Sequence, residues 1–246
     1  LIARVPQLAA RKAARDADPA AAADIDAGLT RALDSLIHNP AFLDLEAAWR
    51  GLHFLATRGR AGSGAEAIMA LDLMVTGPGE DYTARFRTDV FDPDYEDRVE
   101  VPLAAVLADT VFDHQPVLLD RLARMGDLCR VLQVAFIGSV GAGYFGMKSL
   151  AHVPAMPDLV RRSVGGAYAA WNQFQAGDAA RWVSLTVNRF LLRSPHGEGV
   201  EAPADGAFLY RETVDVAHPE WHCWGSPIWA AGVSLAGSYA EHGHTA

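Results

Sequence analysis

Residues 104–140 read AAVLADTVFDHQPVLLDRLARMGDLCRVLQVAFIGSV, and this stretch decides the fold class. Residues 104–111 form an apolar run of strand length, and residues 134–140 form a second one. Between them, apolar side chains recur at helical spacing: Leu118, Leu122, Met125, Cys129 and Leu132. A strand, a helix and a strand in this order predict a right-handed βαβ crossover with a locally parallel pair of strands. The chain is therefore predicted to have a mixed α/β (α+β) fold.

Two helices are predicted before this unit. In the first, apolar side chains recur every three or four residues: Ile25, Leu29, Leu33, Leu36 and Ile37. Asn39 then supplies an N-cap and Pro40 the first position of a second helix. The apolar stripe of that helix is Phe42, Leu45, Trp49 and Leu52. The pattern predicts a helical hairpin over residues 25–58 with a tight corner at Asn39.

Further strands and helices are predicted on both sides of the crossover. The alternation of Met69, Leu71, Leu73 and Val75 predicts a strand, and the charged stretch 80–98 predicts a solvated helix and loop. Residues 183–187 alternate as a strand that ends or bulges near Phe190. Residues 208–214 are predicted to return as an antiparallel strand, which makes the sheet mixed. A last helix is predicted from Ser226-Pro227 to near Gly243.

The chain is expected to fold as one domain behind a short leading segment. Residues 9–23 are rich in alanine and offer little large apolar surface to bury, so residues 1–24 are predicted to be a flexible N-terminal segment. Residues 25–246 are predicted to form the domain, with the helical hairpin at 25–58 and the α/β core at 65–246.

Composition excludes several classes of function. The chain has 246 residues, of which 21% are charged, and a formal net charge of -9, which opposes nucleic-acid binding because phosphate contacts need clustered Lys and Arg. No apolar run approaches the roughly 18–20 residues that span a bilayer, so no membrane insertion is expected. The two cysteines, Cys129 and Cys223, lie in apolar surroundings and are expected to be buried thiols in a reducing compartment.

A glycine motif at residues 141–146, GAGYFG, matches the dinucleotide-binding pattern G-x-G-x-x-G and follows an apolar strand. The dinucleotide motif needs a helix that opens within the glycine run. Tyr144, Phe145 and the prolines that follow predict irregular structure there instead. We therefore interpret the motif as a glycine-rich corner in the core, and no cofactor is expected.

A zinc site is the second chemical alternative, since His218, His222, Cys223 and Glu220 lie close together in sequence. His218, His222 and Cys223 would supply three ligands, and apart from the nearby Glu220 no fourth ligand is evident. The adjacent residues His222 and Cys223 are also poorly placed to occupy two corners of one tetrahedron. No metal site is predicted.

Hydrolase chemistry is the third alternative, because Asp113 and His114 could form half of a catalytic dyad. No G-x-S-x-G motif occurs in the chain, and Asp113 ahead of Pro116 is more simply a helix cap at a strand-to-helix turn. No catalytic residue is predicted.

Several segments, taken together and in order, resemble one protein family. They are residues 37–42 (IHNPAF), 45–53 (LEAAWRGLH), 112–114 (FDH), 136–137 (FI), 145–147 (FGM), 171–174 (WNQF), 178–186 (DAARWVSLT), 189–191 (RFL), 193–197 (RSPHG), 224–226 (WGS) and 239–243 (YAEHG). Over residues 25–243 the chain resembles the large contractile-sheath subunit of the bacterial type VI secretion system, the TssC/VipB/ImpC/EvpB family.

This resemblance implies a structural protein with a tail-sheath-like fold, without catalysis or cofactor, in the bacterial cytoplasm. Such a subunit pairs with a small sheath subunit (TssB/VipA-like), assembles with copies of itself into a helical sheath and surrounds an inner tube protein. A baseplate and a recycling ATPase act on the sheath indirectly. Contraction expels the inner tube, which requires interfaces with two arrangements.

The resemblance also sets the alternatives. Family members carry further chain before the first helix and after the last one, so we expect either a fragment of a sheath subunit or a shortened paralogue that acts as an adaptor or cap without polymerising. A different class, an α/β enzyme, would bind a dinucleotide at the glycine motif or zinc near His218. The family-signature residues are expected to support the fold: Trp49, Arg50, Gly51, Leu52, His53, Phe145, Gly146, Trp224 and Gly225. Glu46 and Arg50 are predicted to form an exposed i, i+4 pair.

Overall fold

The structure is a computed structural model that describes residues 17–59, 71–77, 80–96, 103–150, 153, 166–201, 203 and 207–242. The chain forms two compact units. The first unit consists of residues 1–50 and 191–225, and the second of residues 51–190 and 226–246. The chain therefore passes from the first unit to the second, returns to the first and then enters the second again.

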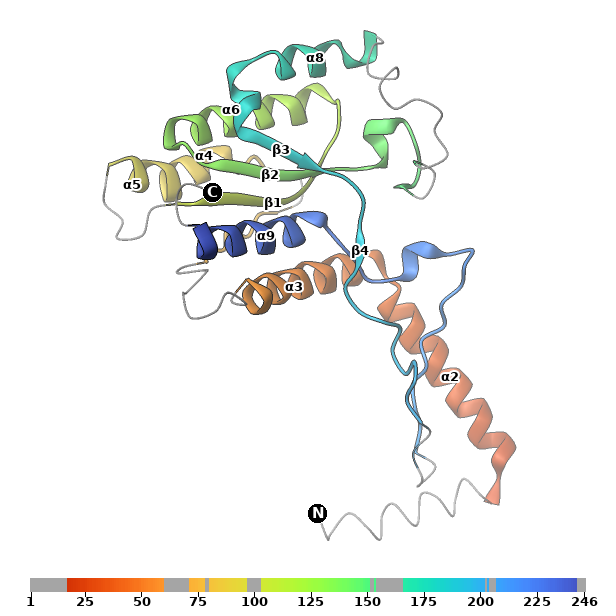
Figure 1. Cartoon of the computed structure of the whole chain (residues 1–246). Helices are drawn as coiled ribbons and strands as arrows, with labels where there is room; N and C mark the ends of the chain where they lie inside the picture. Colours follow the sequence, from red (N-terminus) through yellow and green to blue (C-terminus); the bar gives the residue numbers. More distant parts are fainter. Residues whose placement is uncertain are drawn as a thin grey trace. The chain divides into compact units, whose positions relative to one another are not determined.

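The second unit is built on a parallel sheet (Figure 1). Its strands are β1 (Ala105–Phe112), β2 (Ala135–Val140) and β3 (Val183–Thr186), in the order β1-β2-β3, and both neighbouring pairs are parallel. Helix α6 (Pro116–Leu132) connects β1 to β2. The predicted βαβ unit and the mixed α/β class are confirmed.

Helices cover both faces of this sheet, which explains why its strands read as apolar runs. On one face, α6 buries Leu122, Met125 and Cys129 against Phe112 and Phe136. On the other face, a cluster forms around helix α9 (Pro227–His242). Its buried members are Leu55, Ile137, Ile228 and Trp229. Phe136 and Ile137 are neighbours on β2 and enter opposite clusters, as the alternation of a strand requires.

Residues 80–96, the described part of the charged stretch 80–98, form three short helical pieces, which are α4 (Thr83–Phe86), the π-helix η2 (Arg87–Phe91) and α5 (Asp92–Tyr95). Its charged side chains are exposed or half-buried, as predicted, but Tyr82, Phe86 and Phe91 are buried in the core of the second unit. The prediction of a solvated segment therefore missed one apolar side. The remaining short elements of this unit are η3 (Ala142–Phe145), η5 (Gly166–Tyr168), α8 (Ala169–Gln175) and η6 (Asp178–Trp182).

The first unit contains helix α2 (Pro19–Ile37) and the first part of α3 (Pro40–Arg58). Asp18 caps α2 by accepting a hydrogen bond from the Ala21 N–H at 3.0 Å, and the helix begins at Pro19, before the predicted start near Asp24. Residues 1–16 of the predicted flexible segment lie outside the described residues. Asn39 accepts from the Ala41 N–H at 3.0 Å, as predicted for the cap of α3.

The N-terminal helix pair is confirmed, with α2 and α3 joined at a tight corner by His38 and Asn39. The rest of the first unit is the returning chain. It contains β4 (Phe190–Leu191), η7 (Pro219–Trp221) and β5 (Trp224–Gly225), with β4 paired to β5.

Two strand predictions are wrong. Residues 71–77 are extended but form no described ladder, and Leu71, Leu73 and Val75 are exposed. Residues 207–215 also lie outside any described strand, so the described three-stranded sheet is parallel and not mixed. In both places the sequence alternates, but alternation alone does not supply a hydrogen-bonded ladder. Among the helices that the structure describes, none is both long and apolar enough to cross a bilayer.

Candidate assembly surface

Helix α2 exposes a stripe of large apolar side chains. Ile25, Leu29 and Leu36 follow at i, i+4 and i+11, a spacing that places them on one face of a helix. Ile25 is 63% exposed and Leu36 is 55% exposed, and no residue of α2 is buried. A helix whose apolar side faces water in a folded unit is unusual, because burial of that side is the main source of helix stability.

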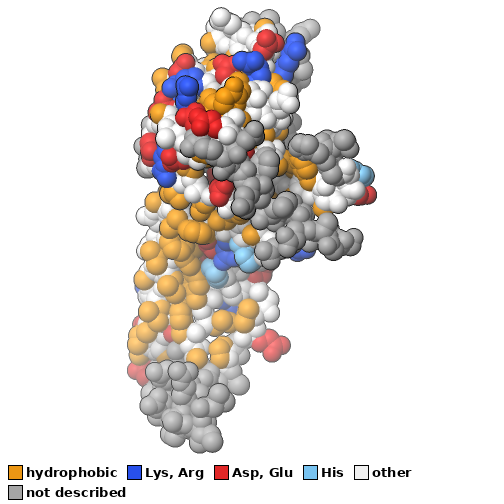
Figure 2. Space-filling model, turned by 90° about the vertical axis from the view of Figure 1, so that its left-hand side faces the viewer, with side chains coloured by type: hydrophobic (Ala, Val, Ile, Leu, Met, Phe, Trp, Pro, Cys, Tyr) orange, Lys and Arg blue, Asp and Glu red, His pale blue; other side chains and the backbone are white. Residues whose placement is uncertain are grey.

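The first part of α3 continues this pattern. Phe42, Leu45 and Trp49 follow at i, i+3 and i+7 on one face, and all three are exposed, Trp49 at 59%. Figure 2 shows hydrophobic side chains gathered in a band along the first unit. We call these six residues the apolar helix face: Ile25, Leu29, Leu36, Phe42, Leu45 and Trp49. An exposed apolar surface of this kind marks an interaction site more often than a free surface.

A different side of α2 is held by the returning chain. The Asp34 carboxylate accepts a hydrogen bond from the Tyr210 hydroxyl at 2.7 Å and from the Thr213 N–H at 3.2 Å. Burial by itself would raise the pKa of Asp34, but these hydrogen bonds outweigh it and the pKa is lowered. Burial and the same carboxylate raise the pKa of Tyr210. The two segments, far apart in sequence, are thus joined by a charge-assisted hydrogen bond.

A buried ion cluster fixes the start of α3 to the returning chain. Arg193 is only 8% exposed and forms two paired contacts. Its Nε and Nη2 donate to Glu46 at 2.8 and 3.1 Å, and its Nη1 and Nη2 donate to Glu212 at 2.6 and 3.3 Å. Glu46 also accepts from Arg50 at 2.8 Å, the pair predicted from the sequence. Bidentate pairs of this geometry are strong and directional.

The cluster keeps its carboxylates ionised. Burial alone would raise the pKa of Glu46, yet hydrogen bonds from Arg193 and Arg50 outweigh it, and the pKa is lowered. The same balance lowers the pKa of Glu212, which accepts from Arg193 and from the His196 N–H. For Arg193, the two carboxylates outweigh burial and raise the pKa. The cluster is therefore charged at neutral pH.

Aromatic stacking closes the side of this cluster next to the corner between the helices. His38 stacks on Trp221 with ring centroids 4.7 Å apart, and His218 stacks on Trp221 at 4.2 Å. The Nε2 atom of His38 lies 3.4 Å from a Glu212 carboxylate oxygen. The corner at His38 is thus packed against the returning chain. These contacts help to fix the position of the two helices that carry the apolar helix face.

Comparison with known proteins identifies the family. Residues 20–246 match the family model VipB, described as "EvpB/VC_A0108, tail sheath N-terminal domain". The chain belongs to this tail sheath family. The family is structural and non-enzymatic, so the expectation from the resemblance is confirmed on both points.

A curated relative supports the same assignment. The "Type VI secretion system sheath protein TssC1" of Pseudomonas aeruginosa is 25% identical over 232 residues. The match covers 90% of this chain and 46% of the relative, so the chain spans about half the length of the curated protein that it matches.

The structure explains why glycine stands at three of the family-signature positions. A Cβ at Gly51 would lie 2.1 Å from the indole of Trp229, and one at Gly225 would lie 2.7 Å from Leu192, both far inside van der Waals contact. Gly146 adopts a φ of 66°, which side-chain-bearing residues rarely adopt. A fold-supporting role for these glycines stays a prediction, which substitution by alanine would test.

The signature residues other than glycine differ in how far the described fold accounts for them. Trp224 donates its indole N–H to the Pro219 carbonyl at 2.6 Å, and Leu52 packs against the core of the second unit. Trp49 and His53 are exposed, so burial in the described fold does not account for them. The remaining two are half-buried, with Arg50 bound to Glu46 and Phe145 in an edge-on contact with Tyr144.

The two other sites considered from the sequence, for a dinucleotide at residues 141–146 and for zinc near His218, have no geometry that favours either ligand. The glycine motif folds as a 3-10 turn, Ala142–Phe145, and not as the opening of an α-helix, so it lacks the array of N–H groups that a dinucleotide phosphate needs. Near His218, the described residues hold no group of three or more potential metal ligands. The His218 Nδ1 lies 2.9 Å from Glu220, and burial raises the pKa of Cys223 to about 11, which opposes the thiolate form.

Asp113 stabilises the turn before α6, although it is not the helix cap that we predicted. The N-cap residue is Gln115, and Asp113 accepts a hydrogen bond from the Gln115 N–H at 2.8 Å. Both cysteines are buried and free, as predicted, and burial raises the pKa of Cys129 to about 12.

Sequence reasoning missed the partners of the ion cluster. It found the Glu46–Arg50 pair but not Arg193 or Glu212, which lie far from Glu46 along the chain. The available signal was weak. Arg193 opens the family segment 193–197, yet nothing local distinguishes a buried arginine from an exposed one.

Proposed function

We propose that this chain is a structural subunit of the contractile sheath of a type VI secretion system and that it pairs with the small sheath subunit through the apolar helix face. The observation that carries the proposal is the exposure of six large apolar side chains on α2 and α3. Membership of the tail sheath family supplies the assembly in which such a surface has a partner.

The geometry favours a helical partner. Apolar side chains at i, i+3, i+4 and i+7 spacing present a ridge that an amphipathic helix can pack against along its length. The buried cluster around Arg193 holds the start of α3 in place before any partner arrives, which reduces the ordering cost of association. Burial of large apolar side chains at roughly 25 cal/mol per Å² then provides the main driving force.

In this proposal the paired subunits assemble with further copies into a helical sheath around an inner tube protein in the bacterial cytoplasm. The baseplate and the recycling ATPase act on the assembled sheath and not on this surface. Nucleotide chemistry has no part in the subunit's own role. The type VI sheath name of the Pseudomonas relative supports this placement.

Co-expression tests the proposal. The chain is produced with the small sheath subunit of the same secretion system, recovered by an affinity tag and examined by negative-stain microscopy. Trp49→Asp and Leu45→Asp place a carboxylate on the apolar helix face. Val117→Asp changes an equally exposed valine, 65% exposed near the start of α6, and serves as the matched control.

We expect the wild-type chain and the control variant to co-purify with the small subunit, and both face variants to lose it while keeping the wild-type circular dichroism spectrum. Tubes or rings in the purified material support a polymerising subunit. Pairing without tubes indicates an adaptor or cap, or a fragment of a sheath subunit that lacks its lattice-forming end. Retention of the small subunit by both face variants contradicts the assignment of the surface.

A further inference from the structure

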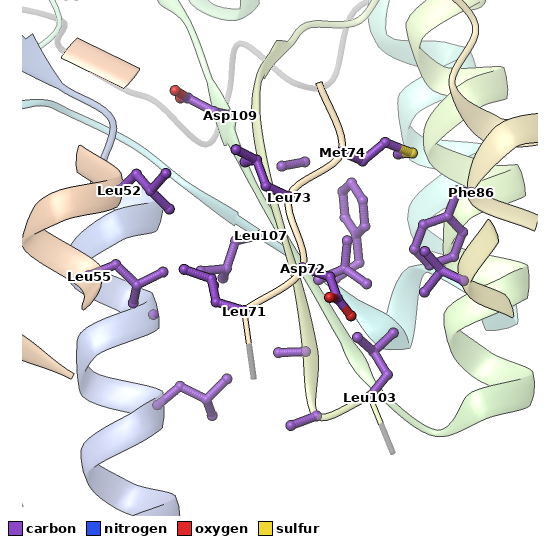
Figure 3. Close-up of a pocket in the computed structure, with 18 of the residues that line it drawn as sticks. Leu52, Leu55, Leu71, Asp72, Leu73, Met74, Phe86, Leu103, Leu107 and Asp109 are labelled. Atoms are coloured by element: carbon purple, nitrogen blue, oxygen red, sulfur yellow. The ribbon is translucent and has the colours of Figure 1, made fainter. Parts of the chain in front are cut away.

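Helix α2 keeps its position in the first unit with little help from burial. None of its residues is buried, and its apolar stripe is exposed. In the second unit, by contrast, apolar side chains from different segments meet. Leu71 lines one pocket with Leu107 of β1 and Leu55 of α3, and Figure 3 shows the three side chains pointing toward one another. Because burial is the main source of stability for most helices, hydrogen bonds contribute a larger share of what holds α2.

Asp34 bonds α2 to the returning chain. Its carboxylate accepts from the Tyr210 hydroxyl at 2.7 Å and from the Thr213 N–H at 3.2 Å. Asp34 follows Ile25 by two and a half helical turns at about 3.6 residues per turn, so the two residues lie on opposite sides of α2. The bonded side of the helix is therefore not the side that carries the apolar stripe.

The same short segment is bonded to the corner and to α3. Glu212 lies between the two residues that donate to Asp34. One of its carboxylate oxygens accepts from Arg193 at 2.6 Å, and Arg193 donates in turn to Glu46 of α3 at 2.8 Å. The other oxygen lies 3.4 Å from Nε2 of His38, the C-cap residue of α2. We call residues 210–213 the corner clamp, because they connect α2, the corner and, through Arg193, α3.

The apolar helix face has one half on α2 and the other on α3. A partner that packs along both halves needs the two helices in one fixed arrangement. If α2 turned freely about the corner at Asn39, its ordering would cost free energy at the moment of binding. The corner clamp reduces this cost, because it ties both helices to one stretch of chain before a partner arrives.

We propose that the corner clamp, through Asp34, positions the α2 half of the apolar helix face for a small sheath subunit that also contacts the α3 half. Asp34 and Tyr210 are then positioning residues that act through α2. This inference rests on the proposed pairing through the apolar helix face. It adds that α2 contributes to the pairing only while the carboxylate of Asp34 is bonded to the clamp.

The first test measures the position of α2 in the full chain without a partner. Spin labels on Ala27→Cys and Asp44→Cys, both exposed positions, report the distance between the two helices by double electron–electron resonance. Asp34→Ala removes the carboxylate and keeps a good helix former, while Asp34→Asn keeps an oxygen that can accept the same hydrogen bonds. Asp24→Ala makes the same change at an exposed position of the same helix and is the matched control.

We expect a narrow distance distribution in the wild type and the control, a broader one in Asp34→Ala and a return toward the wild type in Asp34→Asn. Tyr210→Phe, which removes only the hydroxyl, should broaden the distribution less than Asp34→Ala does. Equal widths in Asp34→Ala and the wild type overturn the inference, because the clamp would not hold α2.

The second test measures the affinity for the small sheath subunit by biolayer interferometry. Asp34→Ala should weaken binding by about fivefold or more, the loss expected for a hydrogen bond to a charged group, and Asp34→Asn should recover most of it. Leu29→Ala shortens the α2 half of the face and Leu45→Ala the α3 half. In the Asp34→Ala chain, Leu29→Ala should lose most of its effect while Leu45→Ala keeps its own, because only α2 has been released.

The outcomes separate this inference from the proposed function. If both leucine variants weaken binding but Asp34→Ala binds as the wild type does, the pairing stands and the inference is overturned. The inference is also overturned if the effects of Asp34→Ala and Leu29→Ala add in full, as they would after a general loss of stability. If neither leucine variant weakens binding by the wild-type chain, the proposed pairing fails and this inference fails with it.

Discussion

Removal of the Arg193 guanidinium is the most direct test of how the first unit is held together. Arg193→Met keeps the length and the apolar stem of the side chain but leaves Glu46 and Glu212 without four hydrogen bonds. The Glu212 side chain is 0% exposed, so water cannot replace the lost partner. Breaking a buried ion pair on one side costs about 3–5 kcal/mol.

The measurement is urea unfolding at pH 7, followed by circular dichroism. With a slope of about 3 kcal/mol per M, a loss of that size lowers the midpoint by roughly 1–2 M urea. Arg181→Met is the matched control, because Arg181 meets Asp178 at 3.8 Å with both side chains largely exposed. Such a pair is worth about 0–1 kcal/mol, so the control should unfold almost as the wild type does.

The pH dependence gives the same experiment a second readout. In the wild type the pKa values of Glu46 and Glu212 are lowered, so their contribution is complete above the ordinary carboxyl pKa near 4.5 and is lost as the pH falls through the folded values. In Arg193→Met, Glu46 keeps its hydrogen bond from Arg50 and Glu212 keeps that from the His196 N–H, but the guanidinium no longer offsets the effect of burial, so both pKa values rise relative to the wild type and protonation is favoured. The stability gap between variant and wild type should therefore narrow from pH 7 to pH 5. A loss below about 1 kcal/mol, or a gap that does not change with pH, would refute this account of the cluster.

Two further predictions concern packing and thiol chemistry. Gly51→Ala should destabilise the chain by about 1–3 kcal/mol, because the added Cβ would meet the indole of Trp229. Gly28→Ala should stabilise it by up to ~1 kcal/mol, because Gly28 lies in α2 with open space around it. Thermal unfolding measures both effects, and equal melting temperatures of the two variants would contradict the contact between residue 51 and Trp229. The thiols of Cys129 and Cys223, with pKa values raised to about 12 and about 11, should resist alkylation by iodoacetamide at pH 8 in the folded chain and react in urea. Mass spectrometry counts the alkyl groups added to the chain. Rapid labelling of the native protein would show that these thiols are not buried.

The parts of the fold that the sequence predicted well are those with local periodicity. The crossover at residues 104–140 was predicted with its helix and both strands, because buried parallel strands and an amphipathic helix each leave a pattern within a few residues. The caps at the helix corner were equally local, as Asn39 shows. The strand predicted at residues 69–75 failed because alternation describes which side chains share a face and not whether another strand lies alongside.

The candidate site was predicted in part. The sequence identified the apolar stripes of α2 and α3 but not that they are left uncovered in this chain, where Ile25, Leu45 and Trp49 are exposed. It identified the Glu46–Arg50 pair but treated it as a surface pair. The partner that changes this reading, Arg193, lies 147 residues away from Glu46 in the chain.

By itself the sequence determined the mixed α/β class, the order of the main helices and strands, and membership of a structural sheath family, because periodicity, caps and family segments are all properties of short stretches of chain. Only the tertiary structure decided which apolar faces are covered and which charges are buried together. These depend on segments that meet only after the chain folds back on itself, and the energy of a side chain is set by what it meets there and not by its neighbours in sequence.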